Sequence, residues 1–123
     1  MSYELIKLKN EDGNMDNHPC RFGMNTLRLF TTLTGIPLNE IDKIGENIDL
    51  DTAIKLAFCG LKDGYRKAGK EFTLSLDDVG DLMDYDINAL ATIMDVFANQ
   101  FNAVIPDESG NVKGVKSPKG PKK

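Results

Sequence analysis

The sequence predicts a mainly α fold: four to five short helices packed around one core, with a small β-hairpin as the candidate structure of the N-terminus. Three observations predict this. The 123 residues suit one ordinary domain, since domains cluster at roughly 100–150 residues. Hydrophobic residues at 41% and charged residues at 28% are typical of a globular chain. From Gly23 onward, apolar residues recur at spacings of three and four, as in helices that bury one face.

A hairpin signal lies at the N-terminus. The segment Tyr3–Leu8 is short and rich in large apolar residues, and Asp12-Gly13 is a dipeptide favoured in tight hairpin turns. The return segment Met15–Arg21 contains His18-Pro19, and proline is confined to sheet edges and strand ends. We therefore expect at most one irregular two-stranded element, and the proline argues against a regular return strand.

The first helix should end at Gly35, a natural C-terminal cap. Its apolar face consists of Met24, Leu27, Leu29, Phe30 and Leu33. Pro37 blocks its continuation, because proline lacks the N–H that a helix interior needs. Asn39 can then cap a brief second helix, which carries Ile41 and Ile44 on one side.

The clearest helical periodicity opens at Asp49 or Asp51 and stops at Gly69. The predicted apolar stripe consists of Leu50, Ala53, Ile54, Ala57, Phe58, Leu61, Tyr65 and Ala68. Gly60 and Gly64 lower the intrinsic helix propensity by roughly 1 kcal/mol each relative to alanine. Packing must therefore hold the middle of this helix, and the two glycines could let a neighbouring backbone approach closely.

Two further helices follow. Ser75 and Asp78 resemble a capping box and open a short one. After Asp86 a longer apolar run predicts the last helix, which stops before Pro106. Its predicted face consists of Ile87, Leu90, Ala91, Met94, Phe97, Ala98 and Phe101, with Ile93 widening it. Residues 1–105 thus form the predicted domain, and 106–123 a disordered lysine-rich tail, because glycine, proline and lysine cannot bury a core.

The charge is divided unevenly along the chain. Residues 1–110 hold 10 basic and 19 acidic residues, a formal charge of −9, whereas 111–123 hold five lysines and no acid, a charge of +5. An acidic body repels phosphate backbones, so we expect no nucleic-acid partner. The chain has no apolar run of the roughly 20 residues that span a bilayer, and charge interrupts its N-terminal apolar stretch. We therefore expect a cytoplasmic protein with no membrane partner.

Catalytic and metal sites are not indicated. His18 and Cys20 lie close together, but structural zinc needs four ligands, and the other thiol, Cys59, belongs to a helical stripe. We interpret both cysteines as free thiols. The aspartates between 77 and 86 do not fit the EF-hand pattern, and nucleophile-elbow and phosphate-loop motifs are absent. We expect no enzyme and no cofactor.

The end of the last helix offers a candidate protein-binding patch. Phe97 and Phe101 are followed by Val104 and Ile105, so apolar residues continue to the end of the ordered chain. If the core leaves them uncovered, they form a patch of the kind that soluble monomers rarely expose without a function. The alternative is that they belong to the core, as most helical stripes do.

The segment that leads into the first predicted helix reads Arg21-Phe22-Gly23-Met24-Asn25-Thr26-Leu27-Arg28-Leu29-Phe30. This segment resembles the tail assembly chaperones of long-tailed (siphovirus-type) bacteriophages. The similarity extends through Leu56–Leu61 and Leu74–Val79 to Phe101. It implies an N-terminal hairpin followed by small helices. It also implies a non-enzymatic factor in the host cytoplasm that binds the tape measure protein, helps to recruit tail tube subunits, and leaves before the tail is finished. In that family a longer form, made by ribosomal frameshifting, often adds a second domain. The lysine-rich end of this chain would suit a linker to such a domain.

On this hypothesis the contact points are Phe97, Phe101, Val104 and Ile105, together with Lys113, Lys116 and Lys119 of the tail, and homo-oligomers are compatible with it. A second hypothesis is a small acidic adaptor or regulatory protein-binding domain, for example an anti-repressor-like binder whose surface imitates nucleic acid. An enzyme is the third class, and no motif points to it.

Overall fold

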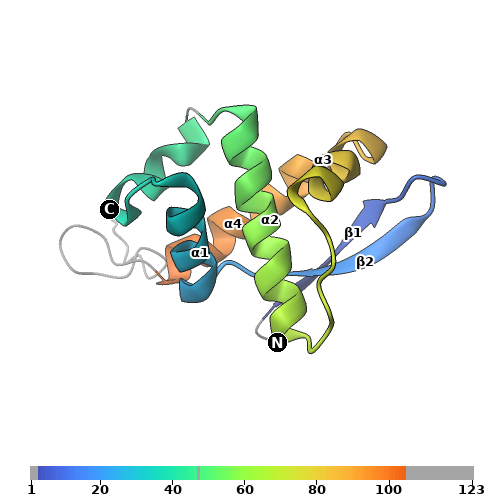
Figure 1. The fold of residues 1–123 in the computed structure, drawn as a ribbon, viewed down its shortest axis with the longest axis horizontal. Helices are drawn as coiled ribbons and strands as arrows, with labels where there is room; N and C mark the ends of the chain where they lie inside the picture. The colour runs from blue at the N-terminus through green and yellow to red at the C-terminus, as the bar shows by residue number, and fades with distance from the viewer. Residues whose placement is uncertain (1–2, 47, 105–123) are drawn as a thin grey trace, which may run out of the picture.

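The computed structural model describes residues 3–46 and 48–104 of the chain. In this part an antiparallel two-stranded hairpin precedes a helical body, so the predicted mainly α fold is confirmed (Figure 1). The elements are β1 (Glu4–Lys9), β2 (Met15–Cys20), α1 (Met24–Thr34), the 3-10 helix η1 (Leu38–Glu46), α2 (Leu50–Lys67), α3 (Leu76–Tyr85) and α4 (Ala89–Val104). The predicted tail, 106–123, lies outside the described residues.

The hairpin is regular, contrary to the doubt about its return strand. β2 runs through Pro19, which pairs with Leu5, and the register continues to Lys9 opposite Met15. Proline is tolerated here because each strand of a two-stranded sheet has an edge where no ladder bond is needed. The turn is held by Asn10, whose Oδ1 accepts the N–H of Asp12 (2.9 Å) and of Asn14 (3.0 Å).

The helix α1 ends where it was predicted to end, but its predicted apolar face was wrong at Met24, which is 55% exposed because it lies at the very start of the helix. It ends at Gly35, which adopts a left-handed φ of 78° that other residues rarely tolerate. The second predicted helix is present as the 3-10 helix η1, which begins at Leu38, one residue before the expected cap. Its Ile41 and Ile44 are both buried, as their spacing of three requires in a helix with three residues per turn.

The helix α2 is the centre of the fold and has α1 and α3 on either side of it (Figure 1). Its buried side is wider than the predicted stripe and includes Leu56, Cys59, Gly60, Asp63 and Gly64. The predicted stripe was wrong at its start, because Leu50 is 66% exposed.

The two glycines of α2 make room for the chain that leaves β2. A Cβ at Gly64 would overlap the backbone carbonyl of Pro19, and one at Gly60 would overlap the ring of Phe22. The Arg21 N–H donates to the Gly60 carbonyl at 3.0 Å. The expected close approach of a neighbouring backbone is therefore confirmed at Gly64.

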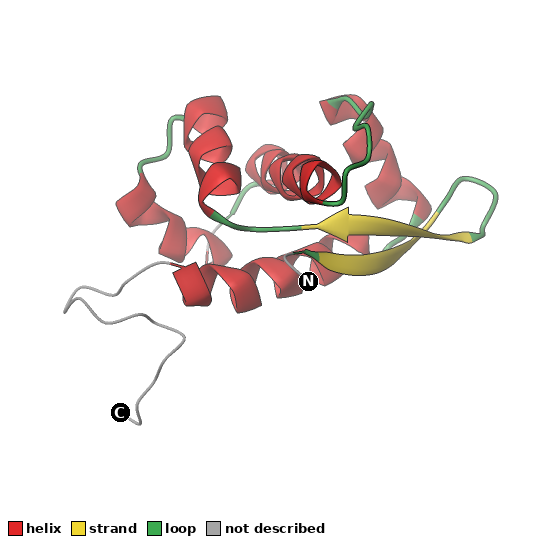
Figure 2. Ribbon diagram, turned by 90° about the horizontal axis from the view of Figure 1, so that it is seen from below, coloured by secondary structure: helices red, strands yellow, loops and turns green. Residues whose placement is uncertain are grey.

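Of the last two helices, α3 packs beside α2, whereas α4 lies on the other side of the hairpin (Figure 2). The capping box of α3 forms as predicted: Ser75 Oγ accepts the Asp78 N–H at 3.1 Å, and Asp78 Oδ2 accepts the Ser75 N–H at 3.0 Å. Figure 2 shows the hairpin between the end-on helix α2 and the long helix α4. The predicted face of α4 was wrong at Ile87, which is 90% exposed and precedes the helix, and at Ala91 and Ala98, which are exposed.

Asp86 ties the hairpin to the junction of α3 and α4. Its Oδ2 accepts the N–H of Lys9, and its Oδ1 accepts the N–H of Asn88, both at 2.9 Å. These two bonds favour the carboxylate and hold the pKa of Asp86 below its usual value. None of the helices in the described part of the chain combines the length and apolar character needed to cross a bilayer.

Candidate functional site

The predicted aromatic patch on α4 belongs to the core. Phe97 and Phe101 are 6% and 4% exposed. The ring of Phe97 meets that of Phe22 edge-on, with centroids 5.3 Å apart and planes at 78°. The core therefore covers the two aromatic residues proposed as contact points. Val104 ends α4, and the side chain of Val104 as well as Ile105, Lys113, Lys116 and Lys119 lie outside what the structure describes.

The residues considered for metal or thiol chemistry lie apart from any assembled site. Cys20 and Cys59 are both buried free thiols. Burial raises the pKa of each thiol to about 12, so neither carries the thiolate that nucleophilic chemistry requires. Within the described residues, no three His, Cys, Asp or Glu side chains are grouped as metal ligands.

His18 is buried against α2, where its Nδ1 lies 2.8 Å from the hydroxyl oxygen of Tyr65. Desolvation lowers the pKa of His18 and outweighs the raising effect of Asp16, while Lys70 lowers it further. A base whose pKa is lower in the folded state than its unfolded value near 6.5 binds fewer protons when folded. The folded protein should therefore lose stability as the pH falls below about 6.5.

This pH dependence can be measured because the chain has one histidine. We expect the urea midpoint to fall between pH 7.5 and 5.5, and the fall to be smaller in His18→Gln. If the urea midpoint fell by the same amount in the wild type and in His18→Gln over this pH range, groups other than His18 would cause the pH dependence.

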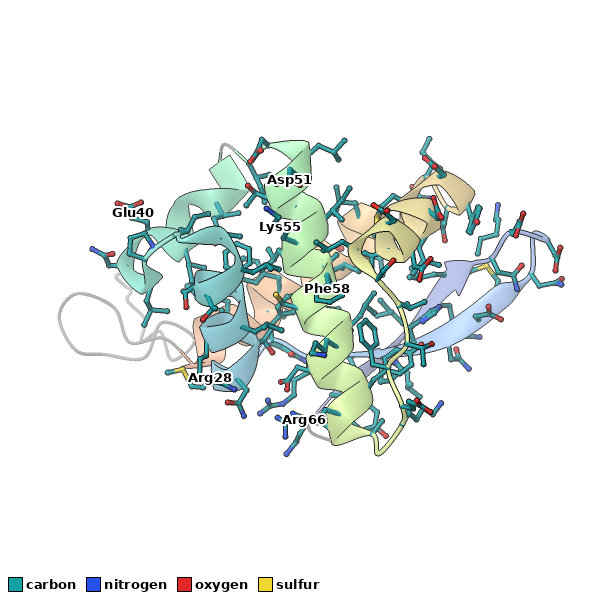
Figure 3. The ribbon with its side chains drawn as sticks, in the orientation of Figure 1. Arg28, Glu40, Asp51, Lys55, Phe58 and Arg66 are labelled. Carbon is teal, nitrogen blue, oxygen red and sulfur yellow. The ribbon has the colours of Figure 1, made fainter. Side chains whose placement is uncertain are left out.

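An open groove of about 520 Å³ lies between α1, the second half of α2, and the segment that follows α2. We call it the basic groove; it is lined by Asn25, Arg28, Leu29, Lys62, Asp63, Arg66, Lys70 and Phe72. Four of these eight residues are cations, on a body whose first 110 residues carry a charge of −9. Figure 3 shows Arg28 of α1 and Arg66 of α2 at the same end of the helix pair.

The floor of the basic groove is built on Asp63, which is 5% exposed. Its Oδ2 lies 3.0 Å from Nη1 of Arg21, and its Oδ1 lies 2.8 Å from Nε of Arg66. The hydroxyl of Thr26 lies 2.9 Å from Asp63 Oδ2 and 2.8 Å from the Arg21 carbonyl oxygen, so its single proton can serve one acceptor at a time. The buried carboxylate is therefore neutralised from two sides.

The rim of the basic groove carries the remaining cations. Arg28 bonds to the neutral amide of Asn25 at 3.3 Å, and Lys62 Nζ lies 5.8 Å from the centre of the Phe72 ring. Lys70 extends from the segment after α2 and is exposed. Among the described residues, no carboxylate lies within ion-pair distance of Arg28, Lys62 or Lys70. The groove therefore presents positive charge that these residues leave uncompensated.

The apolar part of the basic groove comes from Leu29 and Phe72, both half-buried. Phe72 is held edge-on by Phe58, at 5.5 Å and 68°, and by Tyr65, at 5.1 Å and 65°. A ring fixed on two sides is a preorganised surface, which binds a partner with little loss of side-chain entropy. The groove can thus bind a ligand that offers both negative charge and an apolar group.

Sequence reasoning missed the basic groove because its residues come from α1, α2 and the following segment. Each cation alone is typical of a solvated helix face. One signal was available: the density of cations between 62 and 70 on an otherwise acidic chain. Comparison with family models, with curated proteins and with solved structures finds no match to this chain.

Proposed function

We propose that this protein is a non-enzymatic tail assembly chaperone of a long-tailed bacteriophage, which binds the tape measure protein and helps to recruit tail tube subunits. The observation that carries the proposal is the role of residues 21–30, where the sequence resemblance begins. They join the hairpin to the helical body: Phe22 enters the core, the Gly23 N–H donates to Thr26 Oγ1 at 3.1 Å, and Phe30 is buried. The order of hairpin, junction and small helices is that expected for this family.

The surface of the body also supports an assembly role. A chaperone must hold an aggregation-prone partner reversibly and stay soluble. The acidic body favours solubility, and the basic groove offers charge beside apolar surface on rigid elements. Such a groove suits moderate, reversible binding, because exposed ion pairs contribute only about 0.2–1 kcal/mol each.

Co-expression with a fragment of the cognate tape measure protein tests the proposal. We expect the fragment to become soluble and to co-purify with the full chain, because binding covers its apolar surface. The matched control is the fragment co-expressed with an unrelated acidic helical protein of similar size. A fragment that stays as insoluble with the chain as with the control, and that fails to co-purify, would contradict the proposal.

A second candidate is an acidic adaptor that imitates nucleic acid. It is favoured by the depression between α2 and α3, which is lined by Asp51, Asp77, Asp81 and Asp84. This function requires binding to a basic protein that weakens steeply as ionic strength rises from about 50 to about 500 mM, where the screening length falls below roughly 5 Å. Affinity that does not change with salt would count against it.

A further inference from the structure

We infer that the basic groove is a binding site for an acidic peptide segment, in which carboxylates flank one large apolar side chain. This inference goes beyond the proposed function and stands without it, because it concerns the ligand chemistry of a surface. It can be tested on the purified chain alone. If the groove did not bind such a peptide, the result of the tape measure experiment would be unaffected. If the tape measure fragment did not bind, the peptide experiment would still test the groove.

The size of the basic groove fits a short segment. Its volume of about 520 Å³ lies within the roughly 300–1,000 Å³ typical of sites that hold a small ligand or a few side chains. The groove is not enclosed, and its lining reaches from α1 across α2 to the segment after α2. A chain can therefore lie across it and place one side chain in it, with its neighbours over the rim.

The charges at the rim select for carboxylates on both sides of that side chain. Arg28 stands on α1, whereas Lys62 and Lys70 stand on α2 and beyond it, so positive charge borders the groove from both walls. Asp63, the one acidic residue of the lining, is buried and paired with two guanidinium groups. The first turns of α1 and the last turns of α2 line the same groove, so the positive end of one helix dipole lies near the negative end of the other. The two dipoles offset each other, and the charged side chains determine the electrostatic potential of the groove.

The apolar wall selects for a large apolar or aromatic side chain between the carboxylates. Leu29 of α1 and the fixed ring of Phe72, which follows α2, both line the groove. A simple anion such as phosphate would leave this surface wet and gain nothing from it. A peptide that fills it adds the burial of one apolar side chain, about 1.5–3 kcal/mol when complete.

Nucleic acid carries negative charge too, but the rest of the molecule disfavours it. The first 110 residues carry a charge of −9, and a polynucleotide long enough to leave the groove would run along acidic surface. A short peptide confines its charge to the groove. The observations therefore favour a peptide, and an oligonucleotide belongs in the experiment as the competing outcome.

The test is a fluorescence anisotropy titration of labelled hexapeptides with the full chain at low ionic strength. The probe is Glu-Glu-Phe-Gly-Glu-Glu. The comparison ligands are Lys-Lys-Phe-Gly-Lys-Lys, Glu-Glu-Ser-Gly-Glu-Glu and a single-stranded oligothymidine of equal charge. We expect the probe to bind with a Kd on the order of 10–100 µM, and the lysine peptide not to bind. The Ser-Gly peptide should bind about tenfold more weakly, because it leaves the apolar wall uncovered.

The variant Arg28→Glu, Lys70→Glu reverses two exposed rim charges. Its matched control, Lys7→Glu, Lys67→Glu, makes the same change in net charge at exposed lysines outside the groove. We expect the groove variant to lose about tenfold or more in affinity for the probe and the control to lose less than about twofold. Equal losses in the two variants, equal binding of the Ser-Gly peptide, or tighter binding of the oligothymidine would each overturn the assignment.

A second measurement needs no variant, so it remains decisive if the groove variant fails to fold. In a titration of the isotopically labelled wild-type chain followed by amide chemical shifts, the probe should move the signals of residues 25–29 and 62–72. Shifts centred on the hairpin or α3 would overturn the assignment, as would an unchanged spectrum at a millimolar probe concentration.

Discussion

Replacing Gly64 by alanine should be among the most destabilising single changes in this chain, at about 3 kcal/mol. A Cβ at this position overlaps the carbonyl oxygen and carbon of Pro19 and crowds the amide nitrogen of Cys20. These are backbone atoms of β2, which cannot move aside as a flexible side chain can. The strand and the helix must therefore separate, and the burial of Cys20 and its neighbours is weakened. The gain in helix propensity, up to about 1 kcal/mol, offsets only part of this cost.

Gly80→Ala is the matched control, because Gly80 also lies inside a helix but its nearest neighbour would be Ile54 Cδ1 at 3.8 Å, an ordinary contact. We expect this variant to be as stable as the wild type or more stable, by up to about 1 kcal/mol. Thermal and urea unfolding followed by circular dichroism would measure both. A Gly64→Ala protein with a Tm within a few degrees of the Gly80→Ala protein would refute the close packing of β2 on α2.

The helices whose ends are marked by local chemistry could be predicted well from the sequence. The α1 helix ends at a glycine in a left-handed conformation, and α3 begins with a reciprocal Ser75–Asp78 pair. Both signals act within four residues, so tertiary packing does not alter them. The brief helix at 38–46 was predicted for its apolar spacing, and the same spacing of three suits the 3-10 form that it adopts.

The buried faces of α2 and α4 were predicted less well, because periodicity shows a stripe but not how far a neighbour covers it. Leu50 and Ile87 fit their stripes and are exposed, since Leu50 is the first residue of α2 and Ile87 lies in the turn before α4, both beyond the packed middle of the helix. Asp63 and Gly64 are buried although their side chains are polar or absent. Their burial depends on β2 lying against α2, a contact between distant segments that hydrophobicity does not encode.

The second strand of the hairpin illustrates the same limit. Pro19 was a local argument against a strand, and it is buried at the point where the strand meets α2. Proline is confined to edge strands, and both strands of a two-stranded sheet are edge strands, so the rule itself is obeyed. The sequence did not show that the sheet has two strands, and the rule could therefore not be applied correctly. The basic groove likewise depends on the packing of α1 against α2, which no local pattern specifies.

Replacing Asp63 by alanine should also destabilise the protein strongly, by about 3 kcal/mol. The carboxylate is 5% exposed and lies 3.0 Å from the Arg21 guanidinium, whose side chain is only 24% exposed. The Arg21 guanidinium and the buried Thr26 hydroxyl both contact Asp63 Oδ2. The substitution removes this carboxylate from both groups, and the loss of a buried hydrogen-bond partner is costly. The loss falls at the junction of β2 and α1, so we expect it to lower the urea midpoint of the whole domain.

Arg66→Ala is the control for this prediction. It removes the other ion pair of Asp63, but the Arg66 side chain is 54% exposed, so the pair should contribute at most about 1 kcal/mol. A double-mutant cycle between Arg21→Ala and Asp63→Ala should give a coupling energy above about 1 kcal/mol. If Asp63→Ala costs no more than Arg66→Ala, the carboxylate is not the structural anchor of the groove floor.

The isosteric change Asp63→Asn separates this structural role from the electrostatic one. It keeps the size of the side chain and removes the negative charge of the groove floor, so Arg66 is no longer paired with a carboxylate there. If the groove binds acidic peptides, this variant should bind the glutamate-rich hexapeptide about threefold more tightly while being less stable than the wild type. Affinity and stability would thus move in opposite directions. Weaker binding by a variant shown to be folded at the temperature of the titration would contradict the assigned electrostatics of the groove.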